Sequence, residues 1–159
     1  MIEGVGTGGR GFQKLIVWQN AYKLRLLVYT ITERFPKIEI RRVSQMRDAA
    51  RSIKQNIQEG YGKGSIKKYI NYLAISHDSA LEVIGDIQDC FDDRLISAGE
   101  FKMLDSLSGK TIYLLKRLIQ SLRRKEKEGT WVNYYDQGLQ GSQGAERSSR
   151  VREHREIKE

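Results

Sequence analysis

Few residues of this sequence could carry acid–base or nucleophilic chemistry. Histidine occurs twice, at His77 and His154, and the only cysteine is Cys90. Asp78 follows His77 directly, but neighbouring side chains on a helix point about 100° apart and do not form a dyad. A single cysteine allows no intrachain disulfide and no cysteine-based metal site, and beside Phe91 it is typical of an apolar filling residue. The sequence therefore predicts no catalytic residues and no cofactor.

A regular series of carboxylates raises the question of a metal site. It steps by four, four, three and four residues, so that it forms one acidic stripe on a helix: Asp78, Glu82, Asp86, Asp89 and Asp93. Di-metal carboxylate bundles place a glutamate three residues before a histidine. The position three before His77 is Ala74, so we expect no metal.

A basic series, Arg47, Arg51 and Lys54, has the same helical spacing. Like charges at this spacing repel by a few tenths of a kcal/mol per pair, so each stripe favours a neighbour of opposite sign. The acidic and basic stripes could meet within a subunit or across a subunit interface, or both could be solvated faces. We take these residues as the candidate subunit interface.

The stretch Glu59–Ser65 contains three glycines and a lysine, which superficially resembles a phosphate-binding loop. Its spacing is wrong for a P-loop, and a helix rather than a strand precedes it. The glycines are better explained as a turn between helices. Lys63, Lys67 and Lys68 near the start of the next helix could still hold an anion.

Apolar residues recur at steps of three and four in four separate stretches, which predicts an all-α, up-and-down antiparallel four-helix bundle. The first helix is expected at about 17–34, ended by Phe35-Pro36. Ser44 is the expected N-cap of the second, which Gly60, with Gly62 and Gly64 following, ends.

Ser65 is expected to cap the third helix, which runs to about Asp93. Ser97 and Glu100 form a capping box for the fourth, and Gly129 ends it. Residues 12–128 therefore form the bundle. Composition predicts disorder for the glycine-rich residues 1–11 and for most of the polar tail, 129–159.

The formal net charge of +8 lies entirely on residues 1–128, because the tail carries equal numbers of acidic and basic residues. A basic folded part favours an anionic partner, nucleic acid first. The candidate phosphate-binding residues are Arg41, Arg42, Lys63, Lys67, Lys68, Arg123, Arg124 and Lys125. No apolar run is long enough to cross a membrane and the first residues do not resemble a signal peptide, so a cytoplasmic protein without membrane contact is expected.

Several short patterns match a known family. They are Phe12-x-x-Leu15-x-Val17-Trp18-x-x-Ala21, then Phe35-Pro36, then Gln45-Met46-Arg47-x-Ala49-Ala50, and finally Asn56-Ile57-x-Glu59-Gly60-x-Gly62. With these residues the sequence closely resembles the bacterial four-helix bundle proteins of the S23 type, also called 23S rRNA intervening-sequence proteins, over about residues 12–122.

The resemblance implies a bundle that commonly assembles as a homopentamer. Relatives include the accessory variability determinant of diversity-generating retroelements, a basic ring that binds a reverse transcriptase and nucleic acid. The expected function is therefore a non-catalytic accessory factor that binds RNA or DNA, with a reverse transcriptase as a candidate partner. The alternative is a structural or protein-interaction oligomer that does not bind nucleic acid.

Overall fold

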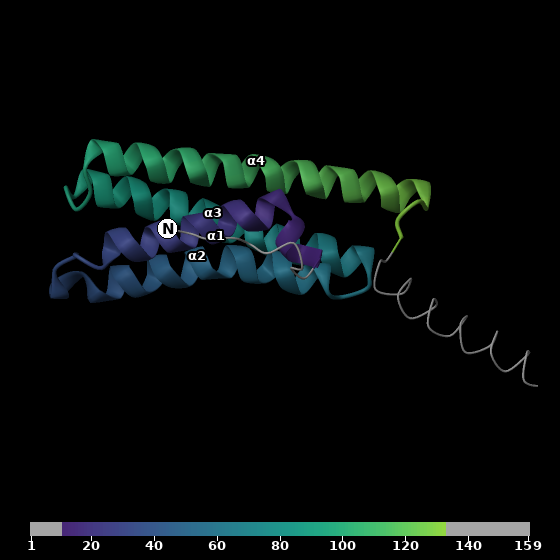
Figure 1. Ribbon diagram of the computed structural model, residues 1–159, viewed down its shortest axis with the longest axis horizontal. Helices are drawn as coiled ribbons and strands as arrows, with labels where there is room; N and C mark the ends of the chain where they lie inside the picture. The colour runs from purple at the N-terminus through teal and green to yellow at the C-terminus, as the bar shows by residue number, and fades with distance from the viewer. Residues whose placement is uncertain (1–10, 133–159) are drawn as a thin grey trace, which may run out of the picture.

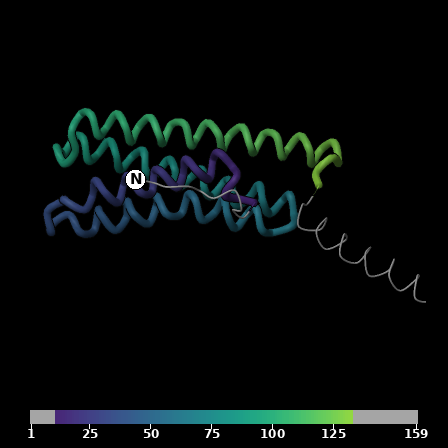
Figure 2. The backbone as a smooth tube through the Cα atoms, in the orientation of Figure 1, coloured from purple at the N-terminus to yellow at the C-terminus, as the bar shows by residue number. Residues whose placement is uncertain are grey.

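The computed structural model describes residues 11–132, and this part of the chain contains helices without strands. A short 3₁₀-helix η1 (Gly11–Lys14) leads into α1 (Ile16–Thr32), and a second, η2 (Lys37–Glu39), leads into α2 (Ile40–Tyr61). The remaining helices are α3 (Ile66–Asp92) and α4 (Ala98–Glu128). The expected all-α four-helix bundle is confirmed (Figures 1 and 2). The disorder expected for 1–11 and 129–159 falls almost wholly outside the described residues.

The helices run alternately up and down, so the bundle has two different ends (Figure 1). At the end that we call the terminal end, α1 begins, residues 62–65 join α2 to α3, and α4 finishes. At the opposite, two-turn end, residues 33–39 join α1 to α2 and residues 93–97 join α3 to α4. The described chain thus enters and leaves the bundle at the terminal end.

The apolar stripes form the core that the sequence predicts. Leu24, Ile53, Leu73, Leu104 and Leu115 are completely buried, so all four helices contribute. Truncating such a leucine to alanine typically costs about 2–5 kcal/mol because it loses apolar burial and leaves a cavity. Trp131, just beyond α4, packs against this core. Among the described helices, none is both long and apolar enough to cross a lipid bilayer.

Three of the expected helix boundaries are confirmed. The Ser65 hydroxyl accepts the Lys68 backbone N–H at the start of α3. Ser97 and Glu100 form both hydrogen bonds of a capping box at the start of α4, and Gly129 ends α4 with a left-handed φ of 66°. Each boundary depends on local chemistry that a sequence displays directly.

The expected start of α2 was wrong. Ser44 does not cap α2 but lies one turn inside it, because the chain resumes helical structure directly after Pro36, through η2. The first turn of α2 carries no apolar periodicity to indicate it, since Ile40 is exposed. The expected ends of α1 and α2 are close to those observed: α1 ends at Thr32, and α2 continues one residue past Gly60 and is capped by Gly62.

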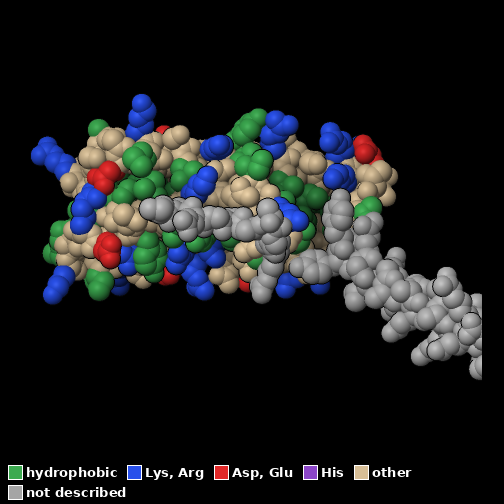
Figure 3. All heavy atoms as spheres, viewed as in Figure 1, with side chains coloured by type: hydrophobic (Ala, Val, Ile, Leu, Met, Phe, Trp, Pro, Cys, Tyr) green, Lys and Arg blue, Asp and Glu red, His purple; other side chains and the backbone are tan. Residues whose placement is uncertain are grey.

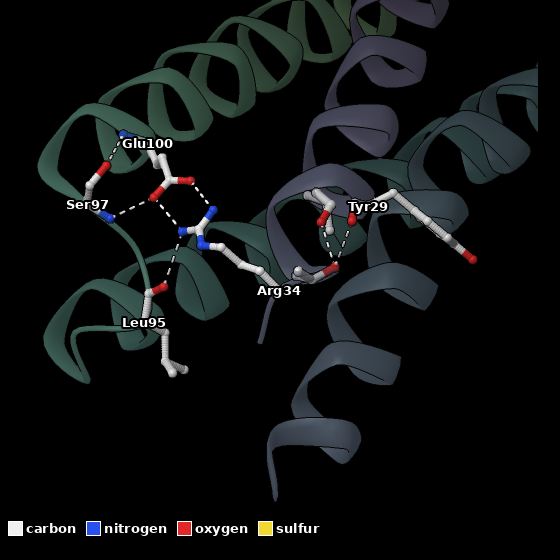
Figure 4. Close-up of polar contacts among 7 residues, drawn as sticks. Tyr29, Arg34, Leu95, Ser97 and Glu100 are labelled. Atoms are coloured by element: carbon white, nitrogen blue, oxygen red, sulfur yellow. Dashed lines mark hydrogen bonds and ion pairs between the residues drawn. The ribbon is translucent and has the colours of Figure 1, made fainter. Parts of the chain in front are cut away.

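A charged contact joins the α1–α2 connection to the start of α4 at the two-turn end (Figure 4). The guanidinium of Arg34 donates to both carboxylate oxygens of Glu100, each at 2.5 Å. The same carboxylate accepts the Ser97 backbone N–H at 2.9 Å, and Arg34 also donates to the Leu95 carbonyl. Glu100 therefore caps its own helix and holds the α1–α2 connection against it.

We expect the substitution Glu100→Gln to lower the free energy of unfolding by about 1 kcal/mol at pH 7, since the ion pair is partly exposed. The hydrogen bond from Arg34, then that from the Ser97 backbone, lowers the pKa of Glu100 to about 2 from 4.5. Because the pKa is lowered in the folded state, this stabilisation is present above about pH 4.5 and is lost as the pH falls toward 2.

Urea unfolding followed by circular dichroism at several pH values measures this contribution. The difference between wild type and Glu100→Gln should shrink as the pH falls through that range. Asp105→Asn, at an exposed carboxylate of the same helix, is the control and should change stability by less than about 0.5 kcal/mol. A Glu100→Gln effect that did not depend on pH would contradict the ion-pair explanation.

Candidate nucleic-acid interface

Most of the predicted phosphate-binding residues lie together at the terminal end. Lys63 lies in the α2–α3 turn, and Lys67 and Lys68 lie in the first turn of α3. In the last turns of α4, at the same end of the bundle, are Arg123, Arg124 and Lys125. All six side chains are exposed. We call these six residues the basic end.

The two remaining candidates lie at the opposite end. Arg41 and Arg42 are in the first turn of α2, which has 22 residues and is therefore about 33 Å long. Arg42 is half-buried and pairs with Glu39 at 3.1 Å and with Asp93 at 2.6 Å. The structure therefore separates this pair from the basic end and leaves Arg42 with its charge already balanced.

The basic stripe lies on the flank of α2 that faces α1. Arg47 donates to the Thr32 hydroxyl at 3.0 Å, and its guanidinium lies 4.0 Å from the centre of the Tyr29 ring. Arg25 of α1 lies 4.8 Å from the same ring. Burial, then the charges of Arg25 and Arg51, lowers the pKa of Lys54. We call Arg25, Arg47, Arg51 and Lys54 the basic flank.

The acidic stripe runs along α3 to its C-cap, Asp93. Its last member, Asp93, pairs with Arg42, which is not one of the flank residues. Asp86 is half-buried, and burial, then the charges of Glu82 and Asp89, raises its pKa. Within residues 11–132, no ion pair connects the basic flank to the acidic stripe. The two stripes therefore do not neutralise each other within one subunit.

A groove between α3 and α4 was not anticipated from the sequence. It has a volume of about 440 Å³ and is lined by Ala74, His77, Asp78, Lys116, Ile119, Gln120 and Arg123. It brings Arg123 of the basic end beside His77, which is distant in sequence. The signal that could have indicated it is the spacing of Lys116, Gln120 and Arg123, which step by four and three along one flank of α4.

The residues considered for catalysis do not form a reactive arrangement. The distance from His77 Nδ1 to the exposed Asp78 Oδ1 is 3.8 Å, too long for a hydrogen bond. Cys90 is buried with its Sγ 3.4 Å from Met46 Sδ, and burial raises the pKa of the thiol, which disfavours the nucleophilic thiolate. In the described part of the chain, no group of three or more His, Cys, Asp or Glu residues could hold a metal ion.

The space-filling view shows how charged and apolar side chains are distributed on one face (Figure 3). Lysine and arginine side chains project around both ends and along α4, and hydrophobic side chains form several patches between them. Several exposed apolar residues lie on α1 and α4, including Ile16, Met103 and Tyr113. A surface that combines cationic and apolar groups suits contact with other macromolecules.

A comparison with protein families identifies a match. The model of the family described as 23S rRNA-intervening sequence protein matches residues 13–117. None of the curated proteins matches the chain. The matched region begins in η1 and ends in α4, six residues before Arg123.

Proposed function

Because the chain belongs to the 23S rRNA-intervening sequence protein family, we propose that it is a non-catalytic, oligomeric accessory factor that binds nucleic acid. The candidate settings are association with rRNA and assistance to a reverse transcriptase. The single observation that carries the proposal is the basic end, where six exposed cations from two segments of the chain lie at one end of the bundle.

Lysine and arginine neutralise phosphates and release the counterions that those phosphates had condensed. Such contacts position a nucleic acid without reading its sequence. The basic end is formed by a turn and two helix ends, and it lacks the helix-turn-helix arrangement that inserts a recognition helix into the major groove. We therefore propose that binding at the basic end has low sequence specificity.

The proposed assembly is a homopentamer, with the basic flank of one subunit against Glu82, Asp86 and Asp89 of the next subunit's acidic stripe, so that Asp78 lies outside the contact. The stripes have opposite sign and complementary helical spacing, and they do not pair within one subunit. In a closed ring, the basic flank and the acidic stripe of every subunit would each contact a neighbouring subunit. It would also gather five basic ends, so that several could hold one nucleic-acid strand together.

Filter binding of the purified full-length protein to a labelled single-stranded RNA tests the proposed function. We expect binding at 50 mM salt that weakens steeply at 200 mM. The slope of log K against log salt should be about −0.7 for each phosphate contact, hence near −4 if one basic end makes six contacts. Failure to bind any nucleic acid at low salt would reject the proposal.

The second candidate function is a structural or protein-interaction oligomer. The exposed apolar side chains of α1 and α4 favour this function, since they offer a surface for protein contacts that do not involve phosphate groups. Light scattering on the same sample separates the candidates. A discrete oligomer that does not bind nucleic acid would identify the structural role, whereas a monomer at micromolar concentration would reject the assembly common to both.

A further inference from the structure

The α3–α4 groove is lined by both cationic or polar side chains and apolar side chains. The α4 wall is cationic and polar, with Lys116, Gln120 and Arg123 on one flank. Ala74 of α3 and Ile119 of α4 add apolar surface. Its volume of about 440 Å³ lies in the range of small-molecule sites, about 300–1,000 Å³.

His77 adds a ring to this groove. Its side chain is mostly buried, with 21% of the surface exposed, and its Nε2 has no hydrogen-bond partner. A buried polar atom without a partner costs stability, and because Nε2 is enclosed, a rearranged ring would be needed for it to regain a hydrogen bond. Asp78 supplies a carboxylate at the exposed rim.

The cationic character of the groove continues toward the terminal end. Lys127 follows Arg123 by four residues on α4, and Lys67 precedes Ala74 by seven on α3, so both share the flanks that line the groove. The groove therefore opens along a basic path to the basic end, which a phosphate backbone could follow.

We propose that this groove holds one nucleotide of a single-stranded nucleic acid, a specific site within the function proposed above, on which it rests. Lys116 and Arg123 bind the phosphate, while the base lies against Ile119 and the His77 ring. Gln120 and Asp78 face the polar edge of the base, where the carboxylate accepts a hydrogen bond from an exocyclic amino group.

The combination of cationic, apolar and ring surfaces in the groove favours a nucleotide over an isolated phosphate. A phosphate alone would leave the apolar and ring surfaces unused and would be repelled by Asp78. A base inside a duplex is stacked on its neighbours, so only an unstacked base can enter a groove between two helices. Stacking on side-chain rings and cationic contact with the backbone are the usual means of binding single strands.

Two charge-matched double variants test the site. Lys116→Gln with Arg123→Gln removes two cations that line the groove. Arg117→Gln with Arg124→Gln removes two cations from the next positions on α4, which do not line it. Each double variant loses two positive charges, so the general electrostatic attraction to phosphate is reduced equally in both. Thermal unfolding of both full-length variants confirms that the comparison is between folded proteins.

Fluorescence anisotropy with a ten-nucleotide cytidine strand measures the difference. We expect the groove variant to lose at least tenfold in affinity and the control two- to threefold. Equal losses would overturn the groove while leaving the proposed function intact, because the wild type would still bind. Absence of wild-type binding would instead reject the proposed function.

The ligand class is tested with other probes. The wild type should bind the cytidine strand more tightly than a mixed-sequence duplex and more tightly than a uridine strand, which lacks the amino group. Asp78→Ala, which removes the acceptor, should abolish the preference for cytidine. Preference for the duplex, or an unchanged cytidine preference in Asp78→Ala, would overturn the assignment. Free cytidine monophosphate that bound as tightly as the strand would overturn the strand site and identify a free nucleotide as the ligand.

Nuclear magnetic resonance gives a readout independent of affinity. The imidazole signal of His77, identified by its loss in His77→Gln, should shift when the cytidine strand is added. The same addition should leave it unshifted in the groove variant. A His77 signal that did not respond in the wild type would place the strand elsewhere and overturn the proposal.

Discussion

Replacing Gly60 by leucine is expected to lower the free energy of unfolding by about 3 kcal/mol or more. No other substitution of a glycine in this bundle is expected to change stability as much. Gly60 is buried where α2 packs on α3. A Cβ atom at this position would lie 2.8 Å from the Tyr72 Cβ and 3.2 Å from the Tyr69 carbonyl oxygen. The backbone and a Cβ cannot yield as a flexible side chain would, so the two helices must move apart.

Chemical denaturation of the variants measures this effect. Even Gly60→Ala should destabilise, because the clash outweighs the gain in helix propensity of about 1 kcal/mol. The matched controls are Gly85→Ala and Gly109→Ala, which also lie inside helices but have nothing within 4 Å of a new Cβ. These should stabilise the bundle by about 0.5–1 kcal/mol each. A stabilising Gly60→Ala would show that α2 and α3 do not pack as described.

Reversing the three lysines at the α2–α3 turn should lower affinity for single-stranded RNA at least a hundredfold at low salt. The variant carries Lys63→Glu, Lys67→Glu and Lys68→Glu, so that each substitution replaces a positive charge of the basic end with a negative one. The salt slope should flatten by about 0.7 for each phosphate that the variant no longer binds. Glutamate in the first turn of α3 also suits the helix dipole, so the fold is not expected to suffer.

Arg41→Glu is the control, because this exposed residue lies at the two-turn end. We expect it to lower affinity less than threefold in the same filter-binding assay. If Arg41→Glu proved as damaging as the triple reversal, the nucleic acid would contact the whole length of the bundle rather than the basic end.

Local chemistry explains which parts of the fold the sequence could predict. Ser65, the Ser97–Glu100 capping box and Gly129 each act within one turn of chain, so their effect can be recognised without tertiary structure. The start of α2 could not be predicted in the same way. Ile40 is exposed, so the amphipathic pattern begins only after the first turn has formed.

The candidate site depended more on tertiary structure. The sequence identified the right kind of residue for phosphate contact but could not show that Arg41 and Arg42 lie far from the others, nor that Arg42 is held by Asp93. The groove was missed because His77 and Arg123 meet only when α3 packs against α4. The spacing of residues along α4 indicated the α4 side of the groove. The α3 side could be recognised only from the three-dimensional structure.

An even number of antiparallel helices places both ends of the described chain, Gly11 and Val132, at the terminal end (Figure 1). Any domain fused to either end would therefore be tethered beside the basic end, where a short link gives millimolar effective concentration. The same geometry makes the two-turn end the place for a reporter that should not compete with a bound strand. A circular permutant that joined the original ends and opened the chain at residues 33–39 would present its new ends there instead.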